Sequence, residues 1–458
     1  MTCHLIVNTT VSGKGTVACS FFRLSIRLDL QHSMMSSVLP YDIIAQIIDS
    51  VGESDDIKLI KALALVSHSF REICTKHLFA TIDLHDEGPM RRASSKKGFI
   101  KLLKRRPEVV KYIRKLTYEV EYDGRFQSAR FASTYRAPRF DYPNTKLSPI
   151  LPNLLRTIIF LNCFIITASK PVNWDTLDSS LTSAFLHLMG LPTINHMELS
   201  TIRKFPISSL TTSVNLRRLD IFNMSIAADG LPEFVVLSKK MPKIREYRAS
   251  GSSSLTTTLL RAKTQDGQPA FNFMDLRRLS ILSPVLGEEE WNLRYFLQNA
   301  KLLEELYLSV TQLGVLDRLY DILSPSARTL KELDLKASLP SRVNNAPHPL
   351  AGLYELLEAM TGDNMLEALS FELLVLAERE REDFIGSAFR KVEEALVKPG
   401  WSALRQVSFQ ISIRSWAPEL SEALQFLPRK YLSHFSKPGS VAFSYECKME
   451  DDYENDYE

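Results

Sequence analysis

A short pattern of apolar residues recurs along most of the chain and constrains the fold more than any other feature. Each copy has an apolar residue, two mostly polar residues, a second apolar residue, one free position and a third apolar residue. Copies begin at Ile113, Leu155, Ile194, Leu216, Ile244, Leu276, Leu303, Leu330, Leu366 and Leu404. The first two copies and the one at Ile244 match less well than the others. A single match arises by chance in a leucine-rich chain, but a series this long indicates an internal repeat.

Each hexamer alternates as a half-buried β-strand does, so its apolar residues are expected to face a shared core. Segments with helical spacing separate several of the hexamers, at 231–241, 291–300, 316–323, 350–360 and 380–398. Strand, loop and helix repeated in this way stack into a curved solenoid with a parallel sheet on the concave side. The sequence therefore predicts an α/β fold that offers a binding surface along the sheet.

The pattern is similar to that of leucine-rich repeats, although it departs from the regular family. The intervals from Leu276 to Leu303 and from Leu303 to Leu330 are 27 residues each, within the range of roughly 20–29 residues for such repeats. The other intervals vary more widely, and few copies have the Asn that completes the standard repeat. The resemblance implies an irregular solenoid with an uneven concave surface.

A different kind of unit precedes the repeats and begins with "LPYDIIAQIIDSV" at Leu39. Pro40 suits the first turn of a helix, and Asp42 lies near the positive end of its dipole. Two more short helices are expected to follow, with Asp55 or Asp56 capping the first and Ser67 capping the second. A unit of about 40 residues buries little surface by itself. We therefore expect its apolar stripe to be covered by a neighbour or a partner.

This unit resembles an F-box, whose pattern opens with Leu-Pro-x-Glu, continues with Ile or Leu pairs at helical spacing, and closes with a Val-Ser or Val-Cys step before an aromatic and a basic residue. The matching positions are Leu39, Pro40, Ile44, Ile47, Ile48, Leu63, Val66, Ser67, Phe70 and Arg71. There are two departures from the pattern: Asp42 replaces the usual Glu, and Phe70 stands where Trp is more typical. The segment after it is similar to the corresponding segment of many fungal F-box proteins.

The resemblance implies that the unit docks onto the Skp adaptor of a cullin–RING ubiquitin ligase and that the solenoid binds a client protein. The chain would then be a non-catalytic substrate receptor. Leu39 and Pro40 would insert into a groove as anchors, and the Ile stripe with Phe70 would complete the apolar contact. The expected adaptor-binding residues are Leu39, Pro40, Asp42, Ile44, Ile47, Ile48, Leu63, Val66, Ser67 and Phe70.

The expected domain organisation has five parts. They are an extension at 1–33, the F-box at 34–84, a basic linker and helix at 85–112, the solenoid at 113–446 and an acidic, disordered tail at 447–458. The extension is interpreted as disordered or as preceding the true start of translation at Met34 or Met35, with a transit peptide as the alternative. The basic linker is interpreted as a solvated helix face, with a nuclear signal or a phosphate contact as alternatives.

Composition argues against several functional classes. The net charge of +3 argues against nucleic acid or an anionic membrane as the main partner. No uninterrupted apolar run approaches the roughly 20 residues that cross a bilayer. The cysteines are Cys3, Cys19, Cys74, Cys163 and Cys447. Because they are scattered and include no CxxC pair, they indicate a reducing compartment, and we expect residence in the cytoplasm, the nucleus or both.

No set of residues with the spacing of an enzyme, cofactor or metal site is recognisable in the sequence. The motifs of hydrolases, phosphate loops, dinucleotide-binding turns, zinc proteases and kinases are absent. Histidines occur singly, and Cys74 is interpreted as a small core residue. Two alternatives to a ligase subunit stay open. One is an interaction scaffold whose Ile stripe packs internally, and the other is an RNA-contacting protein that uses the basic linker and the Arg- and aromatic-rich segment 120–149.

Overall fold

The structure is a computed structural model that describes residues 40–53, 56–85, 96–120, 150–226, 235–236, 241–282, 288–310, 319–339, 351–362, 364–375, 382–413, 418–432, 434 and 441–449. The expected extension at 1–33, the proposed anchor Leu39 and residues 121–149 lie outside this part of the chain.

Three helices form the N-terminal end of the described chain, namely α1 (Tyr41–Glu53), α2 (Ile57–Leu63) and α3 (His68–Leu78). Asp56 caps α2 by accepting a hydrogen bond from the backbone of Leu59 at 3.0 Å. Ser67 caps α3 by accepting one from the backbone of Phe70 at 3.2 Å. Both capping predictions are therefore confirmed.

Twelve strands form one sheet in which the spatial order follows the chain order. The strands are β1 (Thr81–Leu84), β2 (Lys115–Val120), β3 (Cys163–Ala168), β5 (His196–Ser200), β7 (Arg218–Phe222), β9 (Glu246–Ser250), β11 (Arg278–Ile281), β12 (Glu305–Val310), β13 (Glu332–Leu339), β14 (Ala368–Val375), β15 (Gln406–Ile413) and β16 (Ala442–Met449). All neighbouring pairs are parallel. The predicted α/β class with a large parallel sheet is confirmed.

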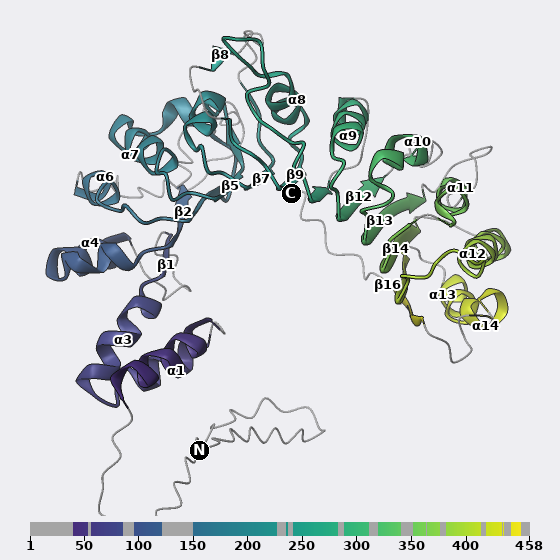
Figure 1. The fold of residues 1–458 in the computed structure, drawn as a ribbon, viewed down its shortest axis with the longest axis horizontal. Helices are drawn as coiled ribbons and strands as arrows, with labels where there is room; N and C mark the ends of the chain where they lie inside the picture. The colour runs from purple at the N-terminus through teal and green to yellow at the C-terminus, as the bar shows by residue number, and fades with distance from the viewer. Residues whose placement is uncertain are drawn as a thin grey trace, which may run out of the picture.

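Helical segments connect the strands and lie on the outer side of a curved sheet, whose other face lines the inside of the arc (Figure 1). They are α4 (Lys96–Arg105), η1 (Pro107–Tyr112), α6 (Ile150–Leu155), η3 (Trp174–Thr176), α7 (Ser179–Met189), η4 (Ile207–Thr212), α8 (Ser253–Arg261), α9 (Glu288–Asn299), α10 (Leu319–Leu323), η6 (Ser324–Ser326), α11 (Ala351–Met360), α12 (Glu382–Leu396), α13 (Pro418–Gln425) and α14 (Leu427–Tyr431). Two small parallel pairs join β4 (Val172–Asn173) to β6 (Ile202–Arg203) and β8 (Val235–Val236) to β10 (Lys263–Thr264).

The repeated hexamers explain the sheet, because their apolar residues supply its core. In the copy at Leu216 the three apolar residues, Leu216, Leu219 and Ile221, are fully buried. A strand begins two residues after the first apolar residue of every copy except the one at Leu155. The buried side chains of the sheet and its helices form one continuous cluster from β1 to α14. Burial of this shared core stabilises the arc as each repeat stacks on the next.

The prediction of a strand at Leu155 is wrong. Leu155 ends α6, and the strand between β2 and β5 is β3, which begins at Cys163. The same apolar spacing recurs six residues later in Leu161, Phe164 and Ile166, all fully buried. In this later frame Cys163 pairs with Lys115 and His196 on the two flanking strands. The apolar spacing alone fits a strand after Leu155 or after Leu161. Pairing of β3 with both β2 and β5 identifies the second as the strand.

Other sequence expectations are confirmed or corrected at the level of single elements. Helices are confirmed within 291–300, 316–323, 350–360 and 380–398. The helix predicted at 231–241 is wrong at Val235 and Val236, which form β8. At the C-terminal end, β16 continues to Met449, beyond the expected end of the solenoid at 446. Within the described residues, no helix has both the length and the apolar character that crossing a membrane would need.

Candidate functional site

The N-terminal helices have a small core of their own. Its buried members are Ile48, Ile60, Ala64, Ile73 and Cys74. Ile44, Leu63 and Phe70 are half-buried against this cluster. Cys74 is fully buried, and this burial raises the pKa of its thiol, as expected for a core residue. The helices therefore pack around a centre that is separate from the core of the sheet.

The apolar stripe of α1 is divided between this core and solvent. Ile48 is 1% exposed, whereas Ile47 is 53% exposed and Ile43 is 37% exposed. Ile43 and Ile47 are one helical turn apart and so lie on the same face of α1. Pro40 is exposed, and its carbonyl accepts hydrogen bonds from the backbone of Ile43 and Ile44, both at 3.1 Å. The start of α1 thus presents Pro40 and apolar side chains together.

A second exposed apolar position lies in the turn between α2 and α3. Leu65 is 79% exposed and Val66 is 66% exposed. We call the exposed apolar residues of this unit the helical docking surface, and they are Tyr41, Ile43, Ile47, Ile57, Leu65 and Val66. Of the residues expected to bind an adaptor, Ile47 and Val66 belong to it, while Asp42 and Ser67 are exposed polar neighbours in sequence. Four other residues of the expected adaptor-binding set pack in the small core, namely Ile44, Ile48, Leu63 and Phe70.

A polar contact fixes α1 against α3. Asp49 Oδ2 accepts a hydrogen bond from Lys76 Nζ at 2.7 Å, and Asp49 Oδ1 lies 2.8 Å from His77 Nε2. Burial alone would raise the pKa of Asp49, but the hydrogen bonds to Lys76 and His77 outweigh it and hold that pKa below its usual value. Gly52 leaves room for the His77 ring, because a Cβ at this position would collide with it.

The inner face of the sheet is lined by charged side chains that follow the strand register. Arg218, Glu246, Arg278 and Glu305 occupy paired positions on β7, β9, β11 and β12. Arg278 Nη1 lies 3.2 Å from Glu246, and its Nε donates to Glu305 at 2.8 Å. We call these four residues the charge ladder. A hollow of about 290 Å³ lies over it, with Asp220, Arg248, Tyr307 and Asp334 also contributing to its wall.

One acid in this hollow is held in an unfavourable setting. Burial and the nearby Glu372 raise the pKa of Asp334 to about 6, and Lys336 only partly offsets them. Lys336 is itself paired with Glu372 at 2.6 Å. The hollow therefore contains the paired charges of the ladder and also Asp334, whose ionised form is destabilised by its surroundings.

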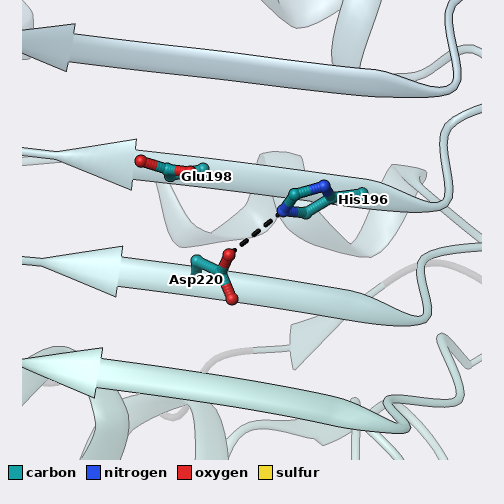
Figure 2. A group of neighbouring side chains, drawn as sticks. All are labelled: His196, Glu198 and Asp220. Carbon is teal, nitrogen blue, oxygen red and sulfur yellow. Dashed lines mark hydrogen bonds and ion pairs between the residues drawn. The ribbon is translucent and has the colours of Figure 1, made fainter. Parts of the chain in front are cut away.

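Next to the ladder, three neighbouring strands bring Cys163, His196 and Asp220 into one chain of contacts. Cys163 Sγ lies 3.1 Å from His196 Nδ1, and His196 Nε2 lies 3.1 Å from Asp220 Oδ2. Figure 2 shows His196 pointing toward Asp220 across the gap between β5 and β7, with Glu198 farther along β5. Arg218 also binds the Asp220 carboxylate, with Nη2 donating to Oδ2 at 2.8 Å.

These contacts set the charges of the group. Burial alone would lower the pKa of His196, but the hydrogen bonds to Asp220 and Cys163 outweigh it and raise that pKa to about 9. Burial would likewise raise the pKa of Asp220, yet His196 and Arg218 hold it below its usual value. His196 is therefore an imidazolium at neutral pH, and Asp220 is a carboxylate that is 2% exposed.

Metal ligand atoms also gather here, since those of His196, Glu198 and Asp220 lie within 4.8 Å of one another. Histidine and carboxylate ligands suit divalent cations. However, Arg218 already donates to both oxygens of Asp220, at 3.3 and 3.0 Å from Nε. Its positive charge, together with the imidazolium of His196, opposes the binding of a cation at this position.

This group is not among the sequence predictions, in which the histidines occur singly. A signal was present, since Cys163 and His196 each lie two residues after the first apolar residue of a repeat, at Leu161 and Ile194. Equivalent positions of consecutive repeats become neighbours across a parallel sheet. Because the repeat was assigned to Leu155 and not to Leu161, Cys163 and His196 were not recognised as equivalent positions of consecutive repeats.

The comparisons with known proteins add no assignment. No family model matches the chain, and no curated protein matches it either. The helical docking surface and the inner face of the sheet are therefore interpreted from their own chemistry.

Proposed function

We propose that the chain is the client-binding subunit of a ubiquitin ligase of the Skp, cullin and F-box type. In this proposal α1 to α3 form an F-box unit that docks a Skp-type adaptor, and the sheet with its helices is an irregular leucine-rich repeat solenoid that binds the client. The observation that carries it is the helical docking surface. A small helical unit with its own core leaves Ile47, Leu65 and Val66 in solvent at 53%, 79% and 66% exposure.

Physical reasoning supports an adaptor as the occupant of that surface. Exposed large apolar residues clustered on so small a unit mark a protein contact more often than isolated ones do. Ile43 and Ile47 on one helix face, with Pro40 at the helix start, suit insertion into an apolar groove. The sequence resemblance to an F-box includes Pro40, Ile47 and Val66, which is why a Skp-type adaptor is preferred to another protein.

The inner face of the sheet is the proposed client surface. Its charge ladder and hollow offer several ionic groups in fixed register, and such groups favour specificity over raw affinity. The chain itself would perform no chemistry. By holding a client near the ubiquitin-carrying enzyme that the ligase recruits, it would raise the effective concentration of the reacting groups.

The test is co-purification of the full chain with a Skp-type adaptor after co-expression. The variants Ile47→Glu and Val66→Glu should each weaken adaptor binding by about tenfold or more, because a charge would be desolvated in an apolar contact. Met274→Glu is the matched control, since Met274 is 60% exposed but lies in the repeat region. Circular dichroism should show all three variants folded.

Two other results would favour the alternatives. If neither the native chain nor Met274→Glu binds the adaptor, the F-box proposal fails and an interaction scaffold becomes the better interpretation. An RNA-contacting protein would instead bind RNA with an affinity that falls steeply as salt rises. The exposed basic residues of α4, including Lys101, Lys104 and Arg105, would be its first contacts.

A further inference from the structure

The chain of contacts from Cys163 through His196 to Asp220 has a chemical consequence that is independent of the proposed ligase role. Cys163 and His196 are register partners on β3 and β5, and His196 is the partner of Arg218 on β7. The sheet therefore fixes the thiol, the imidazole and the carboxylate on three adjacent strands. This differs from a chance surface contact because the backbone pairing holds the three groups in place.

Basic side chains flank Cys163 on both neighbouring strands. His196 Nδ1 lies 3.1 Å from the sulfur and Nε2 lies 3.1 Å from Asp220 Oδ2, so an imidazolium at this position would donate to both groups. Lys115 is the register partner of Cys163 on β2, which adds a second cation on its other side. Glu198 is the nearest opposing group on β5, and burial together with the neighbouring Asp220 raises the pKa of this carboxyl. Arg218 and Glu246 on β7 and β9 complete the charged surroundings.

We propose that Cys163 is an activated thiol and a site of covalent modification by small electrophiles, peroxides included. Thiolates beside imidazolium or lysine groups are the reactive form of cysteine. With hydrogen peroxide, the sulfur attacks one oxygen, a sulfur–oxygen bond forms, and the oxygen–oxygen bond breaks with release of hydroxide. The sulfur is oxidised to a sulfenic acid, and the peroxide is reduced.

The other two described cysteines provide internal comparisons within the same chain. Cys74 is fully buried, and burial raises the pKa of its thiol. Cys447 on β16 is half-buried, and burial raises its pKa as well, despite a hydrogen bond involving Tyr445. Cys163 is also half-buried, so Cys447 is the closer of the two comparisons.

The test is alkylation of the full folded chain by a limiting amount of iodoacetamide, with the extent at each cysteine read by peptide mass spectrometry. In this reaction the sulfur displaces iodide, so one sulfur–carbon bond forms as one carbon–iodine bond breaks. At pH 7 Cys163 should react about tenfold faster than Cys447. The ratio of the two rates should fall as pH rises to 9, because an ordinary thiol ionises over that range.

The variant His196→Asn separates activation from mere exposure. It should slow Cys163 by about tenfold at pH 7, leave Cys447 unchanged, and make the ratio of the two rates nearly independent of pH. Asp220→Asn should act in the same direction, with circular dichroism and the Cys447 rate reporting whether the fold is kept. A second assay with peroxide and a sulfenic-acid probe should label Cys163 in the native chain and not in Cys163→Ser.

Two results would overturn the proposal. One is a Cys163 rate in the native chain no greater than that of Cys447. The other is an unchanged Cys163 rate and pH dependence in a folded His196→Asn variant, which would make the contact structural only.

Discussion

The helical unit and the sheet differ in how completely they bury their apolar side chains. The sheet and its helices share one continuous core, and their inner face is covered with charged residues that pair across strands. The core of the helices α1 to α3 has only five buried apolar residues, and these helices leave large apolar side chains in solvent. A continuous core makes the sheet self-sufficient, whereas the small unit gains from a partner. The difference suggests that one region is a scaffold with a polar face and the other an apolar contact.

The largest expected effect tests whether the two cores are independent. Phe371 on β14 is fully buried in the sheet core. Phe371→Ala should lower the free energy of unfolding of the sheet by about 3–5 kcal/mol, because it leaves a cavity. Hydrogen exchange should show lost protection in β13 to β15 while α1 to α3 keep theirs.

The reciprocal variant is Ile48→Ala, which removes a residue that is 1% exposed in the helical core. It should open α1 to α3 and leave the sheet protected. If either variant unfolds both regions together, the two cores behave as one cooperative unit and the comparison fails.

A smaller effect is expected inside the helical unit at Gly52. Gly52→Ala would place a Cβ against the His77 ring and displace it from Asp49. The loss of this contact and the local strain should cost about 1–3 kcal/mol, more than alanine gains from its helix propensity. Thermal unfolding of the full chain, followed at α1 to α3 by hydrogen exchange, measures it.

The double variant Gly52→Ala/His77→Ala is the control, because it removes the ring that the new methyl group meets. Against His77→Ala alone, the added alanine should then stabilise the unit by up to about 1 kcal/mol. A further loss of stability in the double variant would show that the ring is not the cause.

An intermediate effect of pH is expected on the inner face of the sheet. Burial and Glu372 raise the pKa of Asp334 to about 6, so the folded state binds this proton more tightly than the unfolded state does. The free energy of unfolding should therefore fall as pH rises from about 4 to about 6. Asp334→Asn should reduce that fall and stabilise the chain at pH 7 by about 1–2 kcal/mol, after allowance for solvent screening.

Denaturant unfolding of the native chain and Asp334→Asn at pH 4 and pH 7 measures this difference. If the free energy of unfolding changes with pH equally in the native chain and in Asp334→Asn, solvent screens Asp334 fully. Asp175→Asn is the control for the loss of an exposed carboxylate, since the Asp175 side chain is 64% exposed beside Lys204.

The sequence predicts the repeated strands well because each hexamer buries its apolar residues in the same direction, as at Leu216 and Leu303. It fails where one residue pattern fits two frames, as at Leu155 and Leu161. It also misses β1 and β16 at the two edges of the sheet. Phe79, Ile82 and Leu84 have the apolar spacing of the repeat at β1, whereas the copy at β16 has Ser440 in place of its first apolar residue. Periodicity places Ile47 and Ile48 on one stripe, since a helical stripe is wide. Only packing against α2 and α3 separates the buried residue from the exposed one.

The smallest expected effect concerns the charge ladder. Arg278 is 54% exposed and contacts Glu246 and Glu305 at 3.2 and 2.8 Å. Exposed ion pairs contribute little because the charges are well solvated when apart. Arg278→Ala should therefore change the free energy of unfolding by less than about 1 kcal/mol, and less still at high salt. A larger loss, measured by urea unfolding, would mean that the ladder stabilises the sheet. A small loss fits a surface whose ionic groups can exchange partners with a bound molecule, in contrast to the apolar helical docking surface.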